Sequence, residues 1–231
     1  MRAISSMATR HLLAELAIAA ASAGLGELEV ESVGGIDAEQ RVAAGEETDL
    51  VFLAHAAVAR LADAGHVDAA TVTPLVVSQV AAAVPSGLPE RAARPEGTAF
   101  ADAAELRSAL RAARSIGYST GPSGTALLGM IDGWGLSGEL GDRLVQARPG
   151  VPVATLLAEG EVDLGFQQLS ELVGQPGVTI LGVMPEGCAI DTVFAGAVAT
   201  ASAVTGAAAR LLAFFASPAV ATIKTGHSFR A

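Results

Sequence analysis

Residues 117–128 read Gly-Tyr-Ser-Thr-Gly-Pro-Ser-Gly-Thr-Ala-Leu-Leu, and the extended residues 114–118 run into them. This order predicts a strand, a loop of small residues and a helix that begins near the end of the loop. Backbone N–H groups and the positive end of the helix dipole meet at such a loop, which suits an anion. Standing alone, the pattern favours an ordinary strand-to-helix turn with a Ser or Thr cap. The rest of the chain must therefore decide between a turn and an anion site.

Strand-like and helix-like segments alternate on both sides of this loop. Apolar and alternating runs predict strands at 3–5, 27–31, 49–54, 76–84, 114–118, 145–147, 162–168, 178–184 and 191–200. Helical spacing predicts helices at 10–22, 38–44, 56–64, 103–113, 137–142, 151–160 and 203–217, and one after the quoted loop that ends near 135. Asp37 and Asp102 are expected to cap helices, and the proline-containing segment 85–97 to be a surface loop. Strands alternating with helices are typical of parallel βαβ units, so the predicted class is α/β.

The two halves of the chain resemble each other. Gly45-Glu46-Glu47-Thr48-Asp49-Leu50-Val51-Phe52 in the first half matches Gly160-Glu161-Val162-Asp163-Leu164-Gly165-Phe166 in the second. We therefore expect two similar lobes, each a mainly parallel sheet flanked by helices, joined by crossing hinge strands at 76–84 and 191–200. Lobe 1 would comprise residues 1–80 and 190–231, and lobe 2 residues 81–189. Open α/β sheets bind ligands at their strand ends, which predicts a cleft lined by those loops.

Composition excludes several kinds of partner and cofactor. The 231 residues carry a formal net charge of −10 and show no cluster of Lys or Arg, which argues against nucleic acid. The single cysteine, Cys188, excludes an internal disulfide and a Cys-rich zinc site, and is expected to be a small buried residue. No metal-ligand spacing, Ser-His-Asp order or dinucleotide fingerprint is present, so neither a metal nor an organic cofactor is expected.

The N-terminal segment admits two interpretations. Arg2, Arg10 and the apolar run at 12–21 would suit a secretory signal. However, Glu15 interrupts that run, and its apolar residues fall at the spacing of an amphipathic helix. No run reaches the roughly 18 uncharged apolar residues that a membrane span needs. We therefore expect a cytoplasmic protein without a membrane span, or a periplasmic one if a leader has been removed.

Taken together, these segments resemble the type II periplasmic-binding-protein fold, and in particular the molybdate-binding components of ABC transporters and their relatives. The likeness covers essentially the whole chain. The matching segments are 4–9, 45–52, 116–125, 160–168 and 208–218. The resemblance implies two lobes that bind a small anion.

The sequence departs from a molybdate binder where the family supplies hydroxyl donors. The Ala-Ala-Ser loop of the family reads Ser6-Met7-Ala8 here, the family serine after the third strand falls on Leu53 or Ala54, and the family tyrosine falls near Gln168. Molybdate or tungstate is therefore not the expected ligand. Amide side chains such as Gln167 and Gln168, with loop N–H groups and hydroxyls, suit planar carboxylates better.

The resemblance extends to aconitate isomerase-like members, in which a binding-protein fold shifts the double bond of an unsaturated tricarboxylate. It implies a cofactor-independent isomerase acting on a small di- or tricarboxylate, with a base and donors for the developing charge. The alternative is a non-catalytic substrate-binding protein of an ABC transporter for a small oxyanion or organic anion, with a permease as its partner. A third alternative is a ligand sensor, although no DNA-binding segment accompanies the lobes.

Candidate site residues follow from where the loops present them. His55, just past a strand, is a candidate base, and Tyr118, which ends a strand, a candidate acid or donor; a surface histidine and a core tyrosine are the alternatives. The candidate ligand-binding residues share positions in strand-end loops, first helical turns or a crossing strand: Ser6, Met7, Thr9, Arg10, Ala54, Ser78, Ser119, Thr120, Ser123, Gly124, Thr125, Gln167 and Gln168. Their hydroxyls could instead serve only as caps. His11 and His66 are expected to be solvated, while Lys224, His227 and Arg230 have a weaker case from the tail.

Overall fold

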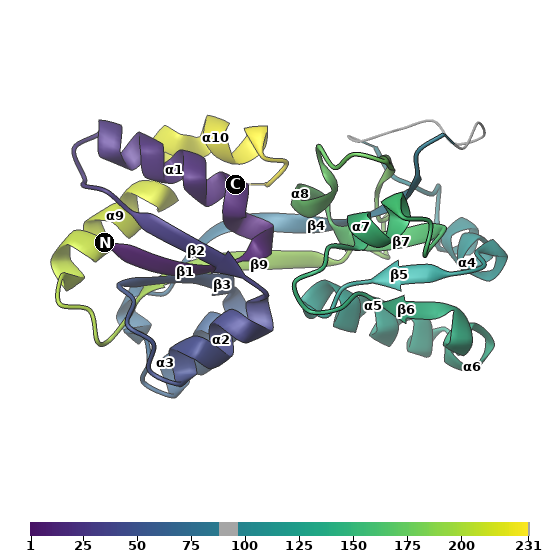
Figure 1. The fold of residues 1–231 in the computed structure, drawn as a ribbon, viewed down its shortest axis with the longest axis horizontal. Helices are drawn as coiled ribbons and strands as arrows, with labels where there is room; N and C mark the ends of the chain where they lie inside the picture. Colours follow the sequence, from purple (N-terminus) through teal and green to yellow (C-terminus); the bar gives the residue numbers. More distant parts are fainter. Residues whose placement is uncertain (88–96, 231) are drawn as a thin grey trace. The chain divides into compact units, whose positions relative to one another are not determined.

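The computed structural model describes residues 1–87 and 97–230 and divides the chain into two compact units. Unit 1 comprises Met1–Ser78 and Thr192–Ala231, and unit 2 comprises Gln79–Asp191. Part of the predicted loop at 85–97 lies outside the described residues. Each unit is described by itself below, with the element labels of Figure 1.

The sheet of unit 1 is mainly parallel. β1 (Arg2–Ser6) pairs in parallel with β2 (Glu29–Val33) on one side and β3 (Leu50–Ala54) on the other. β9 (Asp191–Val198) pairs antiparallel with β3, with Phe52 opposite Gly196. A Cβ at Gly196 would collide with the Phe52 ring and Leu212, so this position accepts only glycine without rearrangement. Because β1 pairs in parallel with both β2 and β3, all three strands end at the same edge of the sheet.

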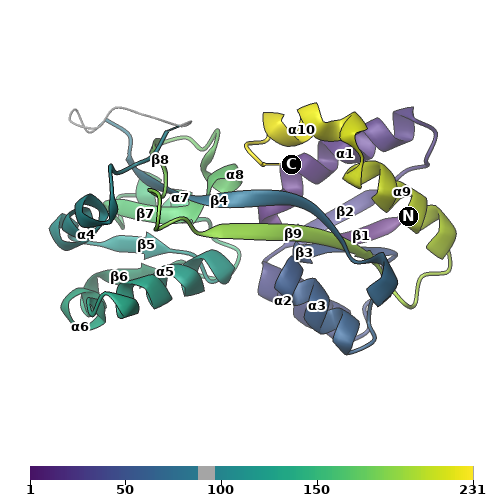
Figure 2. The same cartoon turned by 180° about the vertical axis from the view of Figure 1, so that it is seen from behind.

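Helices cover both faces of this sheet (Figures 1 and 2). α1 (Arg10–Ser22), α9 (Thr205–Ala216) and α10 (Ala221–Gly226) pack on one face, and α2 (Gly35–Ala43) and α3 (His55–Asp63) on the other. The side chains of β3 alternate between the two cores. Leu50 and Phe52 contact the α1 side, whereas Val51 and Leu53 contact the α2 side. The shorter elements of unit 1 are the 3-10 turns η1 (Met7–Thr9), η2 (Ala69–Thr71) and η4 (Pro218–Val220).

The sheet of unit 2 is mixed, with parallel and antiparallel pairs. β5 (Ile116–Tyr118) pairs in parallel with β6 (Leu144–Gln146) and with β7 (Leu164–Gln168). β4 (Thr73–Pro85) runs antiparallel to β7 and to β8 (Val178–Val183). The strand order within unit 2 is β4-β7-β5-β6, and β8 pairs with β4 off this path.

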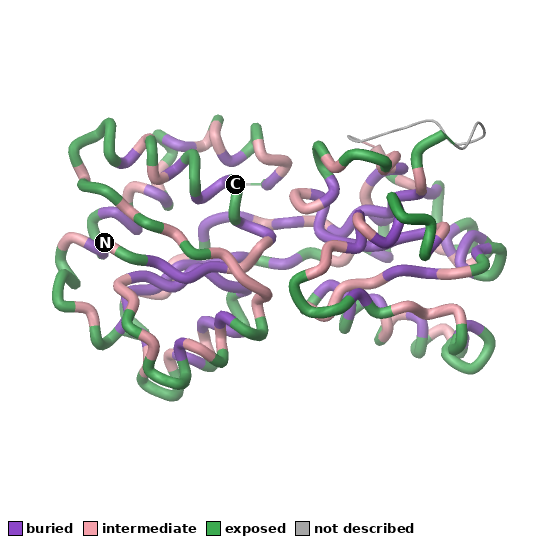
Figure 3. Tube along the Cα trace, viewed as in Figure 1, coloured by how far each residue is buried: buried purple, intermediate pink, exposed green. Residues whose placement is uncertain are grey.

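Two cores lie on opposite faces of the unit 2 sheet. β7 is buried along its whole length, whereas β6 and β8 are largely half-buried or exposed (Figure 3 colours the chain by burial). Val80, Ala82 and Val84 of β4 pack with α4 (Ala103–Ala112) and α5 (Pro122–Gly133). Ala81 and Ala83 of β4 pack with α7 (Val153–Ala158) and α8 (Leu169–Leu172). The remaining elements are α6 (Ser137–Leu140) and η3 (Gly141–Arg143).

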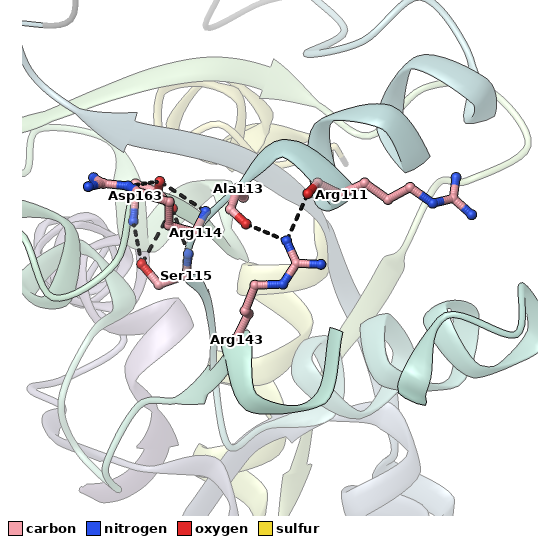
Figure 4. Close-up of polar contacts among 6 residues, drawn as sticks. All are labelled: Arg111, Ala113, Arg114, Ser115, Arg143 and Asp163. Carbon is pink, nitrogen blue, oxygen red and sulfur yellow. Dashed lines mark hydrogen bonds and ion pairs between the residues drawn. The ribbon is translucent and has the colours of Figure 1, made fainter. Parts of the chain in front are cut away.

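The repeated Gly-Glu segments have a structural explanation at the start of the parallel strands (Figure 4). Asp163 accepts hydrogen bonds from the backbone N–H groups of Arg114 (3.1 Å) and Ser115 (2.9 Å), just before β5. Asp49 accepts one from the N–H of Arg2 (2.9 Å) in unit 1. Burial alone would raise the pKa of Asp163, but the N–H groups of Ser115 and Arg114 hold it below its usual value. In both halves this aspartate ties the start of a neighbouring strand.

The α/β class is confirmed, as is the cap of α4, since Asp102 accepts hydrogen bonds from the N–H groups of Ala104 and Glu105. Unit 2 departs from the expected mainly parallel sheet, because β4 pairs antiparallel with both β7 and β8. Two predicted caps are wrong. Asp37 lies inside the first turn of α2, whose N-cap is Gly34. α5 has Gly121 rather than a serine or threonine at its N-cap, because Pro122 already supplies the first helical residue. Cys188 is buried, as predicted.

Candidate functional site

The edge of unit 1 where β1, β2 and β3 end is also where α1, α2 and α3 begin. η1 connects β1 to α1 over Met7–Thr9, α2 starts two residues after β2, and α3 starts directly after β3. The strands are parallel, so these helices direct their N-terminal ends toward one edge of the sheet. The backbone therefore brings the partial positive charges of α1, α2 and α3 to one place.

The N-cap residues of these helices leave the first-turn N–H groups without a side-chain cap. The N-cap of α2 is Gly34 and that of α3 is Ala54, neither of which carries a polar side-chain atom. The N-cap of α1 is Thr9, whose hydroxyl donates to the Ser6 carbonyl (3.1 Å) rather than accepting from the helix. The first turns of α1 and α3 also contain no acidic side chain. α2 carries Asp37 in its first turn, and the Arg10 N–H already donates to the Met7 carbonyl, so α3 has the least occupied of the three helix starts. Helix N–H donors without a side-chain cap bind a carboxylate or oxyanion.

Several predicted residues lie at this edge. Ser6 ends β1 half-buried, and its hydroxyl accepts a long hydrogen bond from the Ala8 N–H (3.4 Å). Met7 is half-buried in η1, while Thr9 is buried. Arg10 opens α1 with an exposed side chain. The structure thus places Ser6, Met7, Thr9 and Arg10 within one connection between β1 and α1.

Ala54 and His55 occupy the neighbouring connection. Ala54 is the last residue of β3 and is 9% exposed, so it contributes backbone rather than side-chain groups. His55 is the first residue of α3 and is exposed. This is the strand-to-helix position predicted from the sequence, and its exposure leaves the imidazole accessible from solvent.

Sequence reasoning missed Ser5 and Ser32 at the same edge. They lie opposite each other in the pairing of β1 with β2, and their Oγ atoms are 2.7 Å apart. Ser5 is fully buried, so its hydroxyl fixes β2 to β1 directly behind the Ser6 loop. The available signal was the Ser5-Ser6 pair, of which only the second serine was chosen.

Ser78, the last residue of unit 1 before the chain enters unit 2, is a buried hydroxyl in β4. Its Oγ atom has no hydrogen-bond partner in the part of the chain that the structure describes. A buried hydroxyl without a partner costs free energy, which distinguishes Ser78 from the apolar residues Val76 and Val80 on the same face of the strand.

The quoted loop of unit 2 follows β5, with α5 beginning at Pro122. The Oγ atoms of Ser119 and Ser123 lie 2.8 Å apart, which closes the loop over the helix start. A Cβ on Gly124 would overlap the Ser119 carbonyl oxygen. Gly124 is therefore required for the first turn of α5 to pack on this loop. The N-cap residue of α5 is Gly121, which has no side chain and therefore cannot cap the helix with a side-chain atom.

The other predicted residues of this loop are less buried. Thr120 is half-buried, and Thr125 is exposed with its hydroxyl 3.5 Å from the Gly121 carbonyl oxygen within the helix. Tyr118 ends β5 half-buried and packs against the core beneath α4 and α5. The surroundings of Tyr118 match the alternative of a core tyrosine as well as that of a donor.

Gln167 and Gln168 end β7 and are both buried. The Oε1 atom of Gln167 accepts a hydrogen bond from the Val153 N–H (2.8 Å), the first residue of α7. This bond caps α7, whose own N-cap residue is Pro152. A capping role therefore occupies the carbonyl oxygen of Gln167, and its role as a ligand donor stays a prediction, as does that of Gln168 at the N-cap of α8.

Metal ligands and membrane-spanning helices are two further features that the structure can test. No group of three or more His, Cys, Asp or Glu among them is placed to hold a metal ion. Within residues 1–87 and 97–230, no single helix has the length and apolar character to cross a membrane. Only the bent pair Thr205–Ala216 and Pro218–Gly226 together meets the length and composition limits.

The fold and the helix N-termini at the strand ends define a protein of the solute-binding class. A family of bacterial extracellular solute-binding proteins matches residues 1–230, and the chain belongs to this family. Family membership confirms that a small ligand is the expected partner, and the likeness to molybdate-binding proteins is confirmed at the level of the fold.

The chain is similar to aconitate isomerase of Pseudomonas sp, with 32% identity over 181 residues. This match covers 77% of the chain and 65% of that relative, so the chain spans slightly less than two thirds of the relative's length. Among solved structures, it is similar to the periplasmic molybdate-binding protein of Azotobacter vinelandii, with a TM-score of 0.80, 16% identity, and coverage of 100% of this chain and 99% of that chain. The sulfate-binding protein SubI of Mycobacterium tuberculosis H37Rv matches with a TM-score of 0.77, 19% identity, and coverage of 100% and 86%.

Proposed function

We propose that this protein binds a small di- or tricarboxylate and isomerises it by moving its double bond, as with aconitate. The observation that carries the proposal is the meeting of the N-terminal ends of α1, α2 and α3 at one edge of unit 1, with N-cap residues that do not cap them. Such N–H groups recognise carboxylate oxygens and stabilise charge that develops on them. The similarity to aconitate isomerase supports the choice of reaction.

The reaction needs only proton transfer. A base removes a proton from the CH₂ group next to one carboxylate, and the electron pair spreads over the adjacent double bond and the carboxylates. Return of the proton to the far carbon of this three-carbon system leaves the double bond in the new position. No electron is gained or lost, so the step requires neither a redox cofactor nor a metal, and backbone N–H groups can hold the negative charge of the intermediate.

His55 is the proposed base, and Tyr118 a proposed donor. His55 opens α3 at the same edge as Ser6, and its imidazole is exposed. A histidine accepts and returns protons near neutral pH. The proposed ligand donors in unit 1 are Ser6 and Arg10, together with the first-turn N–H groups. Ser119 and Ser123 are the proposed hydroxyl donors in unit 2.

The second candidate function is a non-catalytic solute-binding protein that delivers an anion to an ABC permease. The fold likeness to molybdate- and sulfate-binding proteins favours it. In that case a variant of His55 would bind as well as the unmodified chain, because binding needs donors but no base. A cytoplasmic location fits the enzyme and a periplasmic location fits the transporter component, so we propose the former together with the isomerase.

Titration with cis- and trans-aconitate separates the candidates. Proton NMR and ultraviolet absorbance should show interconversion after dialysis against a metal chelator, and His55→Gln should lower kcat by about 10²-fold or more while leaving binding in place. His66→Gln, at a histidine in a turn after α3, is the matched control and should retain full activity. Binding without interconversion would leave the transporter candidate, and absence of aconitate binding would overturn the isomerase proposal.

A further inference from the structure

We propose that the neutral imidazole of His11 sequesters the Arg10 guanidinium at the first turn of α1, and that protonation of His11 releases Arg10 to contact a ligand carboxylate. This inference deepens the proposed function, on which it rests for its last step, the contact between Arg10 and a ligand carboxylate. His11 is exposed, in agreement with the sequence expectation, and its imidazole also contacts Arg10.

The contact is direct. Arg10 Nη2 lies 3.0 Å from His11 Nε2. A guanidinium can only donate, so Nε2 must be the unprotonated nitrogen and the ring proton must lie on Nδ1. A protonated His11 has no acceptor nitrogen and places a second positive charge beside Arg10. The bond between them therefore exists only while His11 is neutral.

α10 places a second histidine against the same part of α1. His227 Nε2 lies 2.8 Å from Glu15 Oε2, one helical turn after His11 on α1. His227, the residue that follows α10, thus faces the part of α1 that carries Arg10, His11 and Glu15. Lys224, one turn before His227, lies on the buried side of α10 and has its pKa lowered by burial. Glu15 is the acidic member of this otherwise basic group, and its partner is His227.

Burial lowers the pKa of His11, and the positive charges of Arg10 and His227 lower it further. The direction of the pH dependence follows from this contact. The Arg10–His11 bond is intact at pH values above the pKa of His11 and is lost as the pH falls through it. A carboxylate bound by Arg10 would neutralise the charge that opposes protonation of His11, and so would raise that pKa. Anion binding should therefore be accompanied by uptake of a proton.

The contact can be tested without any ligand. Long-range ¹H–¹⁵N NMR should show neutral His11 with its proton on Nδ1, and Arg10→Gln should raise the pKa of His11. The ring signals of His66 serve as the control and should keep their chemical shifts at a fixed pH. A proton on Nε2 of neutral His11, or an unchanged His11 pKa in Arg10→Gln, would overturn the proposal whatever the ligand turns out to be.

The last step is tested by calorimetric titration with trans-aconitate in buffers of different ionisation enthalpy. The unmodified chain should take up more protons on binding than His11→Gln, and its affinity should rise by up to about tenfold per pH unit on acidification, because one proton is linked. Proton changes of the ligand itself cancel between the two proteins. His66→Gln should behave like the unmodified chain. Equal uptake in the unmodified chain and His11→Gln would refute the linkage, whereas no binding would refute the proposed function and leave the NMR result standing.

Discussion

Asp163→Ala should destabilise unit 2 by about 2–3 kcal/mol. The carboxylate of Asp163 accepts the backbone N–H groups of Arg114 and Ser115, and its side chain is only 24% exposed (Figure 4). A hydrogen bond to a charged group contributes about 1.5–3 kcal/mol, and a buried donor without an acceptor costs a similar amount. The Ser115 N–H is partly buried and bears the main loss, whereas the more exposed Arg114 N–H can bond to water.

The ion pair adds little to this value. Arg114 Nε lies 3.2 Å from Asp163, but the arginine side chain is 89% exposed. Solvent screens such a pair, and its contribution is typically about 0–1 kcal/mol. The loss should therefore come from backbone hydrogen bonds, and Asp163→Asn, which retains one acceptor oxygen, should fall between alanine and the unmodified chain.

Urea unfolding measured by tryptophan fluorescence is the appropriate assay, because the single tryptophan, Trp134, lies in unit 2. Glu161→Ala, in the same Gly-Glu segment and exposed, is the matched control and should change the free energy of unfolding by less than about 0.5 kcal/mol. The pKa of Asp163 is lowered in the folded chain, so its stabilisation is complete above the unfolded pKa and is lost as the pH falls through the folded one.

The difference between Asp163→Ala and the unmodified chain should shrink at acid pH for this reason. If Asp163→Ala and Glu161→Ala were equally stable at pH 7, the structural explanation of the repeated segment would be wrong. A functional role for Asp163, rather than a structural one, would then have to explain the repeated segment.

Two further substitutions, each with a control substitution, test the geometry of unit 2. Gly124→Ala should destabilise by about 1–3 kcal/mol and weaken anion binding, because its Cβ would overlap the Ser119 carbonyl. Gly129→Ala, in the same helix with open space around it, should instead stabilise the protein by up to about 1 kcal/mol. Equal shifts of the melting temperature in Gly124→Ala and Gly129→Ala would contradict the close approach of Gly124 to Ser119. Gln167→Leu should cost about 1–3 kcal/mol in chemical denaturation by leaving the buried Val153 N–H without its acceptor. The exposed Gln146→Leu should be nearly neutral, and a neutral Gln167→Leu would free that residue for a ligand role.

Segments with strong local signals were predicted closely. The helix at 10–22 has both observed ends correct, because its leucines recur at helical spacing and glycines follow its end. Asp102 was recognised as a cap because an aspartate before a helical pattern bonds to the N–H groups two and three residues later. These features depend on neighbours only a few residues away.

Features that depend on distant residues or on side-chain orientation were missed or misassigned. The Ser5–Ser32 pair joins residues 27 positions apart, and the Gln167 cap reaches the start of another helix. The bond between Arg10 and His11 was also missed, because adjacent residues on a helix point in different directions unless their long side chains fold toward each other. Side-chain orientation at such positions is decided by packing.

By itself, the sequence determined the α/β class, the order of strands and helices apart from the short helices α8 and α10, and the loops at which small polar residues gather. Each of these follows from local periodicity and turn chemistry. Only the tertiary structure decided which of those loops share an edge, namely the connections after β1, β2 and β3, and that their helices begin without side-chain caps. It also decided that Asp49, Asp163 and Gln167 serve backbone N–H groups. The physical reason is that a hydrogen-bonding group is committed to whichever partner the fold brings within reach, and that partner is usually far away in the chain.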